Sequence, residues 1–371
     1  MTMLDSIPTM LATLAAAAPA ESAPSPAGFW MPVGASTVAG DVDFTMDFIN
    51  WVCGFFLLLV TVLMVIFVVK FRAKPGDAIR MGGPVHHTGL ELTWTIIPGI
   101  LSMAFFWFGF KGYLDMQTVP KNSFDVNVTA MKWAWNFKYP NGAQSEDLYV
   151  PAGRPVRLIL RASDVLHSCY IPAFRVKKDC VPGRTTNIWF QCDFPTGLDV
   201  DAAHALRCAE YCGTGHSNMN RKVYVLVQED FDNWVTKQAN WLDEVPDSEL
   251  SSIAGPKLYA RCAQCHSLDG TPGIGPTWKG LWDRVNGGAG SDGKFTDGKG
   301  YKDIIGPGKE FETPEAYIED SIWNPGKHVV APFGNVMPTF KGQVNQRGAE
   351  AIIGMMKSLD QFDAKGKPIA K

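Results

Sequence analysis

Cys208-Ala-Glu-Tyr-Cys212-Gly-Thr-Gly-His216-Ser-Asn-Met219 brings two thiols, an imidazole and a thioether together within twelve residues. Soft sulfur ligands combined with imidazole favour copper over magnesium or calcium, and a weak axial Met tunes a copper redox potential. The two cysteines are too far apart for a Cys-x-x-Cys redox motif, and their spacing suits two sulfurs that bridge a pair of metal ions. The competing interpretation is a disulfide loop with an unrelated histidine. We therefore predict a copper site on this loop.

A second motif lies further along the chain, at Cys262-Ala-Gln-Cys265-His266. This is the Cys-x-x-Cys-His signature of covalent c-type haem attachment, in which the thiols form thioethers with the porphyrin and the histidine binds iron. Met337, within Val-Met-Pro-Thr-Phe, is the candidate for the sixth iron ligand. A zinc ribbon would need a second pair of Cys or His after Cys265, and none follows. Residues 348–358 have the apolar periodicity of a final helix.

The segment 208–219 resembles subunit II of cytochrome c oxidase, whose binuclear copper A centre uses C-x-E-x-C-G-x-x-H-x-x-M. Each fixed position of that pattern is present. Asp164-Val-Leu-His167-Ser168 also matches the family. The resemblance implies that the copper ligands are His167, Cys208, Glu210 through its main-chain carbonyl, Cys212, His216 and Met219. It further implies that the Glu210 carboxylate binds a magnesium ion at the border with subunit I.

Two uncharged stretches near the N-terminus are long enough to span a membrane. Residues 49–69, at ~1.5 Å each, cover the ~30 Å hydrocarbon core, and residues 92–110 form the second stretch. The loop between them is basic, with Lys70, Arg72, Lys74 and Arg80. Because positive residues collect on the cytoplasmic side, both termini and all the metal-binding sequence are expected on the outer face. A buried helical hairpin is the alternative.

Residues 1–40 are interpreted as a leader. Met10 to Ala20 is an apolar stretch that ends in Ala-Pro-Ala, as a cleaved signal peptide does. However, this stretch is preceded by the acidic Asp5 and not by a basic segment. Whether the leader is removed stays open.

From residue 124 the pattern changes to short alternating runs, such as Phe124-Asp-Val-Asn-Val-Thr, separated by turn signals. This pattern is typical of a small antiparallel β-sandwich that carries metal ligands on its loops. We therefore predict a multidomain membrane protein, in which a polar helical connector over 236–254 tethers the haem domain. Its parts are a transmembrane helical hairpin over 41–116, an all-β cupredoxin-like copper A domain over 117–240, and the connector with an all-α class I cytochrome c domain over 241–371.

The resemblance to the family also implies functional roles for Glu91 and Trp133. Glu91 begins the second apolar stretch, in a string similar to the family's second helix, where this glutamate lies at the mouth of a proton pathway into subunit I. The alternative is a solvated acid favoured by the helix dipole. Trp133 opens the run Trp133-Ala-Trp-Asn-Phe-Lys-Tyr139, which lies over the copper site in the family and receives electrons there. Alternation would place its aromatic rings on one strand face, and Ala134 stands where relatives carry a bulky aromatic.

Some residues of the predicted copper domain have no assigned role. Cys169, Cys180 and Cys192 are interpreted as buried thiols, with a disulfide between two of them as the alternative. Residues 195–206 form an enlarged loop relative to the family, and His204 within it is interpreted as an exposed imidazole.

The formal charge of −3 gives no basic excess, so nucleic acid is not expected as a partner. The resemblance implies a proton-translocating cytochrome c oxidase of the respiratory chain, in the bacterial inner membrane, with subunit I and other subunits as partners. Electrons would pass from a quinol-oxidising complex or a small cytochrome to haem c, then to copper A, then to the oxygen-reducing subunit I. Alternatives are the copper A subunit of a nitric oxide reductase and a quinol oxidase subunit with a structural sandwich. The intact ligand set in 208–219 argues against the latter.

Overall fold

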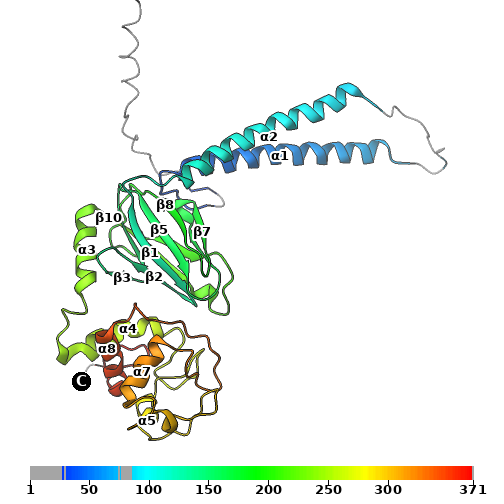
Figure 1. Ribbon diagram of the computed structural model, residues 1–371. Helices are drawn as coiled ribbons and strands as arrows, with labels where there is room; N and C mark the ends of the chain where they lie inside the picture. The colour runs from blue at the N-terminus through cyan, green and yellow to red at the C-terminus, as the bar shows by residue number, and fades with distance from the viewer. Residues whose placement is uncertain (1–26, 29–30, 74–75, 77–85, 370–371) are drawn as a thin grey trace, which may run out of the picture.

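The computed structural model describes residues 27–28, 31–73, 76 and 86–369 of the chain. It consists of a helical hairpin, a β-sandwich and a helical C-terminal region (Figure 1). The hairpin leaves one end of the sandwich, and the C-terminal helices lie at the opposite end (Figure 1). Most of the expected leader lies outside the described residues, as do Lys74 and Arg80 of the basic loop.

Both predicted membrane spans are helical, as α1 (Ala39–Lys70) and α2 (Thr88–Gln117). Each helix extends beyond the uncharged stretch, because backbone hydrogen bonding continues into the polar residues that flank it. The most apolar windows have mean hydropathies of 3.1 and 1.5, and none of their residues is buried. A core helix hides its apolar side chains, whereas these helices expose theirs. Both helices are therefore long and apolar enough to cross a membrane.

The hairpin is anchored to the sandwich by a buried arginine. The Arg175 guanidinium donates to both carboxylate oxygens of Asp43 in α1, at 2.7 and 3.0 Å, and to the carbonyl oxygens of Pro32 and Pro172. A planar guanidinium with this many partners fixes orientation as well as distance. This contact therefore sets the position of the sandwich relative to α1.

The sandwich consists of two five-stranded sheets, with orders β3-β2-β1-β5-β8 and β4-β10-β9-β6-β7. The strands are β1 Phe124–Met131, β2 Ala134–Lys138, β3 Gln144–Ser145, β4 Leu148–Pro151, β5 Val156–Ala162, β6 His167–Ile171, β7 Val176–Cys180, β8 Thr186–Phe190, β9 His204–Cys208 and β10 Asn220–Leu226. In β5, Val156, Leu158, Leu160 and Ala162 are buried in alternation with less buried residues. This period of two fills the space between the sheets.

The prediction of a sandwich is confirmed, but the sheets are not wholly antiparallel. β1 pairs with β5 in parallel, and β10 pairs with β4 in parallel. The reason lies in the connections. The chain crosses from the first sheet at β3 to the second at β4 and then returns, so β5 comes to lie beside β1 in the same direction rather than through a hairpin.

The predicted connector over 236–254 is only partly a free helix. Its first residues belong to α3 (Gln228–Asn240), which packs on the sandwich through Phe231 and through Trp234, whose ring stacks on Tyr149 at 4.0 Å. The link that remains is built of short turns, the 3₁₀ segment Asp247–Glu249 and the π segment Leu250–Ala254. The tether is therefore shorter than the polar composition predicted.

The C-terminal region encloses a second hydrophobic core. Its helices are α4 Gly255–Cys262, α5 Leu281–Val285, α6 Tyr301–Ile304, α7 Pro314–Trp323 and α8 Gln346–Lys357, followed by the 3₁₀ turn Leu359–Gln361. The predicted final helix is α8. It crosses α4 closely, since a Cβ at Gly255 would come within 2.8 Å of Met355 Cβ. Only glycine allows this approach of the two helices.

Candidate functional site

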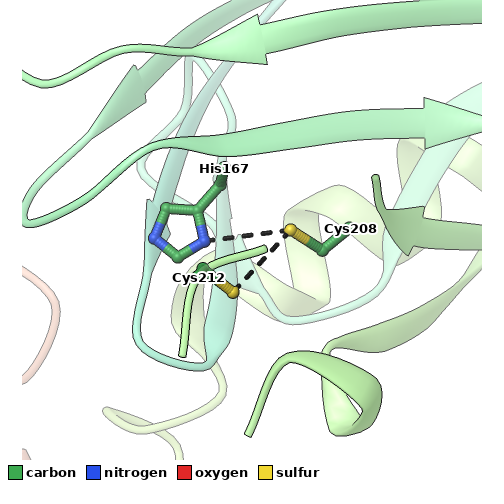
Figure 2. Close-up of side chains that lie close together, drawn as sticks. All are labelled: His167, Cys208 and Cys212. Atoms are coloured by element: carbon green, nitrogen blue, oxygen red, sulfur yellow. Dashed lines mark hydrogen bonds between the residues drawn. The ribbon is translucent and has the colours of Figure 1, made fainter. Parts of the chain in front are cut away.

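Two neighbouring strands bring a histidine and a cysteine to the same end of the sandwich. His167 begins β6 and Cys208 ends β9, and these strands are antiparallel neighbours. Cys212 follows on the next loop. Cys208 Sγ lies 3.9 Å from Cys212 Sγ and 3.9 Å from His167 Nδ1 (Figure 2). All three ligand atoms lie within 4.8 Å of one another, close enough to share a metal centre.

The other predicted copper ligands lie around the same two cysteines. Cys212 Sγ is 3.5 Å from His216 Nδ1 and 3.9 Å from Met219 Sδ, and Cys208 Sγ donates to Glu210 O at 3.2 Å. Each cysteine thus has one histidine nitrogen beside it. Two thiols, two imidazoles, a thioether and a carbonyl form a donor set that fits a pair of copper ions bridged by sulfur.

The orientation of His167 is fixed by a residue that the sequence did not single out as functional. His167 Nε2 contacts Asp164 Oδ1 at 2.9 Å, which leaves Nδ1 facing Cys208. Burial raises the pKa of Asp164, but hydrogen bonds from His167 and from the backbone N–H groups of Lys132 and Val165 outweigh burial and lower it. An ionised carboxylate behind a ligating imidazole fixes its tautomer and its direction. The signal in the sequence is the acid three residues before the histidine.

The two thiols differ in acidity when no metal is bound. Burial raises the pKa of Cys208, but hydrogen bonds, first among them the one from His167, lower it to about 6 overall. Burial and the charge of Cys208 raise the pKa of Cys212 to about 12. Since both ligands must be thiolates, metal binding has to displace the proton of Cys212.

Trp133 lies in the turn between β1 and β2, directly against residues 208–219, which we call the cysteine loop. Its Nε1 donates to Cys212 O at 3.1 Å, and its ring covers Gly213 and Gly215. Trp135, Phe137 and Tyr139 are buried in the sandwich core, as the aromatic alternation predicted. Trp133 precedes β2 and belongs to the same hydrophobic core as these three rings. Trp135, within β2, reaches the same loop, because its Nε1 donates to Met219 O at 3.3 Å.

Replacing Gly215 with Ala is expected to disturb the cysteine loop. A Cβ at this position would lie 2.5 Å from Trp133 Cδ2, so the ring or the loop has to move, and overpacking of this kind costs ~1–3 kcal/mol. We expect a lower melting temperature and an altered visible spectrum of the copper-loaded protein. Gly40→Ala is the control, because a Cβ there meets nothing within 4 Å. Identical spectra and melting temperatures for Gly215→Ala and the parent would contradict this close contact.

A largely apolar cavity lies in the C-terminal region. Among its lining residues are Cys262, Cys265, His266 and Met337, which are all four predicted haem-binding residues. Most of the others are hydrophobic, including Leu258, Ile274, Trp278, Ile318, Ile322, Val330, Phe333, Phe340, Ile352 and Met356. A large apolar ring system with two thioether links and two axial ligands fits this lining. Trp133 of the sandwich also lines this cavity.

His266 is held in one orientation. Its Nδ1 lies 2.6 Å from Pro276 O, to which it donates, so Nε2 is the ring nitrogen available to iron. Gly275 lies under the ring, where a Cβ would come within 2.8 Å of Cε1. Gly275-Pro276 thus orients the imidazole from a position ten residues further along the chain.

Glu91 lies in the first turn of α2 and is half-exposed. Its Oε1 accepts from His87 N at 3.1 Å, while His87 Nδ1 accepts from Leu90 N at 3.1 Å. This reciprocal arrangement resembles a capping box and stabilises the helix start. The proton-pathway role concerns a neighbouring subunit and stays a prediction.

The structure also describes the three cysteines and the histidine of the sandwich that have no assigned role. Cys169, Cys180 and Cys192 are buried free thiols, so in the described part of the chain the disulfide alternative is wrong. His204 is not the predicted exposed loop imidazole. It begins β9, its ring meets Phe174 edge-on at 5.1 Å, and burial lowers its pKa. The enlarged loop ends earlier than predicted because β9 pairs with β10 from His204 onward.

Comparisons with known proteins agree with this arrangement. Residues 99–226 match the family "Cytochrome C oxidase subunit II, periplasmic domain", and residues 24–111 match the corresponding "transmembrane domain". Cytochrome c oxidase subunit 2 of Alkalihalophilus pseudofirmus is 30% identical over 321 residues, which are 82% of this chain and 83% of the relative. An alternative cytochrome c oxidase subunit 2 of Bradyrhizobium diazoefficiens is 27% identical over 242 residues, covering 57% and 84% of the two chains.

A solved structure of the periplasmic domain of subunit II of cytochrome oxidase from Bradyrhizobium japonicum is 25% identical, with a TM-score of 0.31, and covers 33% of this chain and 99% of that one. The subunit II family implies a binuclear copper A centre, and the cluster of His167, Cys208 and Cys212 lies in the matched periplasmic domain. The chain belongs to the cytochrome c oxidase subunit II family and is a membrane-bound component of a haem–copper oxidase.

Proposed function

We propose that this chain is the subunit through which the oxidase receives electrons. They pass from a c-type haem in the C-terminal region to a binuclear copper A centre in the sandwich, and on to the oxygen-reducing subunit I, coupled to proton translocation. The position of Trp133 carries the proposal. Trp133 lines the cavity with Cys265 and His266, and it also donates its indole N–H to Cys212 O. One side chain therefore links the two candidate metal sites.

The copper site would use the residues around the two cysteines, where copper supplies one-electron transfer. The proposed ligands are His167, Cys208, the Glu210 carbonyl, Cys212, His216 and Met219. Asp164 orients the first histidine, and the complete burial of Met219 excludes water from one side of the site. Ligands held in place by strands and loop contacts need little rearrangement when the charge changes, and this favours rapid electron transfer.

The C-terminal region would be a class I cytochrome c domain, which supplies a second one-electron carrier. Cys262 and Cys265 would form the thioether links, and His266 Nε2 and Met337 would be the axial ligands. The apolar lining supports this assignment, because it keeps water from the iron. The proposed domain organisation keeps a leader over 1–40, the hairpin over 41–116, the copper domain over 117–240, and the connector with the cytochrome domain over 241–371.

The remaining proposals concern the neighbouring subunits. Glu210, between the two cysteines, is exposed, and the neighbouring Tyr211 is 75% exposed. Both side chains are therefore available for contact with subunit I, and the Glu210 carboxylate would bind the magnesium ion. Glu91 would lie at the mouth of a proton pathway. The metal-binding domains and both termini would lie on the periplasmic face of the bacterial inner membrane. A quinol-oxidising complex or a small cytochrome would be the donor.

Replacing Trp133 with Ala is expected to slow copper reduction by the attached haem while both metal spectra persist. The change removes the side chain shared by the two sites, and we expect the rate to fall about tenfold, equal to ~1.4 kcal/mol in activation free energy. Flash injection of an electron into the haem, followed optically, measures this step. Trp133→Phe keeps a ring but loses the hydrogen bond to Cys212 O, so it separates the two contributions.

Trp189→Ala is the matched control, since Trp189 lies on β8 and does not line the cavity. A parental rate in Trp133→Ala would mean that the residue is only packed and that electrons take another route. For the whole complex, the test is oxygen consumption by the purified membrane assembly with reduced cytochrome c. Nitric oxide consumption without oxygen consumption would contradict the proposal.

A further inference from the structure

The helix that carries Cys262 is joined to the sandwich by four polar side chains, which we name the polar clamp: Glu146, Arg221, Arg261 and Gln264. Glu146 Oε2 accepts from Arg221 Nη2 at 2.8 Å, and Glu146 Oε1 lies 3.3 Å from Arg261 Nε. Arg261 belongs to α4, whereas the other two charged residues belong to the sandwich. One carboxylate therefore pairs with an arginine from each side of the junction.

Gln264 completes the clamp from within the haem-attachment motif. With the amide oriented by its neighbours, its nitrogen donates to Trp133 O at 3.0 Å and its oxygen accepts from Arg221 Nη2 at 3.0 Å. One of the two residues between the cysteines of the motif thus hydrogen-bonds directly to the tryptophan of the copper domain. The sequence alone marks Gln264 only as a variable position of Cys-x-x-Cys-His.

Apolar contacts beside the clamp cross the junction in both directions. Met131, at the end of β1, is 1% exposed and belongs to the hydrophobic core of the C-terminal region, against which Ala134 also packs. In return, Cys265 and Ile274 pack against the core of the sandwich. Interlocked cores of this kind are typical of a docked interface rather than of two domains joined only by a tether. The small Ala134 leaves room for the approach.

We propose that the polar clamp holds the C-terminal domain in one docked arrangement, with its cavity against Trp133, so that electron transfer within the chain does not wait for domain motion. This proposal rests on the proposed function and adds positioning residues to it. The three charged side chains of the clamp are only 15–22% exposed. Charges this far from solvent are screened weakly by salt, and removing one partner leaves the others unpaired. Glu146 has two arginine partners, so its neutralisation should weaken the clamp most.

The test compares Glu146→Gln with Asp125→Asn in the full, metal-loaded chain. Asp125 also pairs with an arginine, Arg157, but both lie in the sandwich, so this control removes the same charge without touching the junction. The probe is a photoexcited ruthenium trisbipyridine complex that reduces the haem. In the parent and in Asp125→Asn we expect transfer to copper at a rate independent of solvent viscosity. In Glu146→Gln we expect a fall of about tenfold, as when one molecule in ten is docked, and dependence on viscosity.

A second measurement does not depend on electron transfer. Hydrogen–deuterium exchange over residues 131–134 and over α4 should increase in Glu146→Gln and stay unchanged in Asp125→Asn. Should Glu146→Gln lose either metal spectrum, Gln264→Ala serves instead, because it removes two hydrogen bonds from the clamp and leaves its three charged side chains in place. A parental rate, viscosity independence and exchange in the tested variant would overturn the clamp. Absence of haem-to-copper transfer in the parent would instead overturn the proposed function.

Discussion

Replacing Cys212 with Ala is expected to abolish the binuclear copper spectrum. The oxidised parent should show electron paramagnetic resonance hyperfine structure from two equivalent copper ions that share one unpaired electron. Cys212 Sγ lies beside three other donor atoms, Cys208 Sγ, His216 Nδ1 and Met219 Sδ. Its loss separates His216 and Met219 from the rest of the donor set, and one bridging thiolate cannot equalise two metal ions. Loss of an outer-sphere partner alone weakens metal binding by ~10–100-fold, so loss of this ligand should cost at least ~100-fold.

Cys192→Ala is the matched control for the copper prediction. Cys192 is a buried thiol of the same sandwich, but its Sγ contacts Phe194 O and none of the proposed ligands. Copper stoichiometry by metal analysis and the resonance spectrum should be unchanged in this variant. Two equivalent copper ions in Cys212→Ala, or a single-copper spectrum in the parent, would refute the bridged arrangement.

Sequence reasoning was most successful where the site is local. Five of the six proposed copper ligands lie within residues 208–219, so the shortness of this segment alone keeps their side chains close together in space. The uncharged stretches likewise predicted both long helices, because a membrane span is a property of a continuous segment. His167 lies distant in sequence, and only the family resemblance brought it into the set.

The sequence could not predict features that depend on long-range contacts. The hydrogen bond from Trp133 Nε1 to Cys212 O joins residues 79 positions apart along the chain. Parallel pairing of β1 with β5 follows from chain crossings between sheets, which alternation does not encode. The docking of the C-terminal region depends on Glu146 meeting Arg261, and these residues are more than a hundred positions apart.

The docked junction changes the physical reason for one expectation. A short tether raises the effective concentration of the C-terminal domain near the cysteine loop. This effect alone predicts electron transfer at a rate that depends little on protein concentration. A tethered but free domain would still meet the sandwich through exposed charges and would respond to salt. The interlocked cores around Met131 and Ile274 remove that encounter. Weak salt dependence then follows from docking rather than from tether length.

Replacing Met337 with Ala is expected to remove the sulfur–iron charge-transfer band and to lower the reduction potential of the haem. Met337 lines the cavity together with His266, in the loop that precedes α8. A thioether favours ferrous iron, and axial ligands as a class set haem potentials over a span of ~0.8 V, so the shift should be a substantial part of that span. Optical spectroscopy and a redox titration of the full chain measure both effects.

Met356 is the rival ligand, because it also lines the cavity, whereas Met355 packs against Gly255 and Gly366. Met356 lies on α8, is 5% exposed and belongs to the hydrophobic core of the C-terminal region. A side chain committed to helix packing cannot swing to the iron without opening that core, whereas Met337 lies on a loop and is only half-buried. Met356→Leu should therefore keep the band and the potential. If the band survives in Met337→Ala and disappears in Met356→Leu, the sixth ligand is Met356, and α8 rather than the preceding loop forms the distal wall of the cavity.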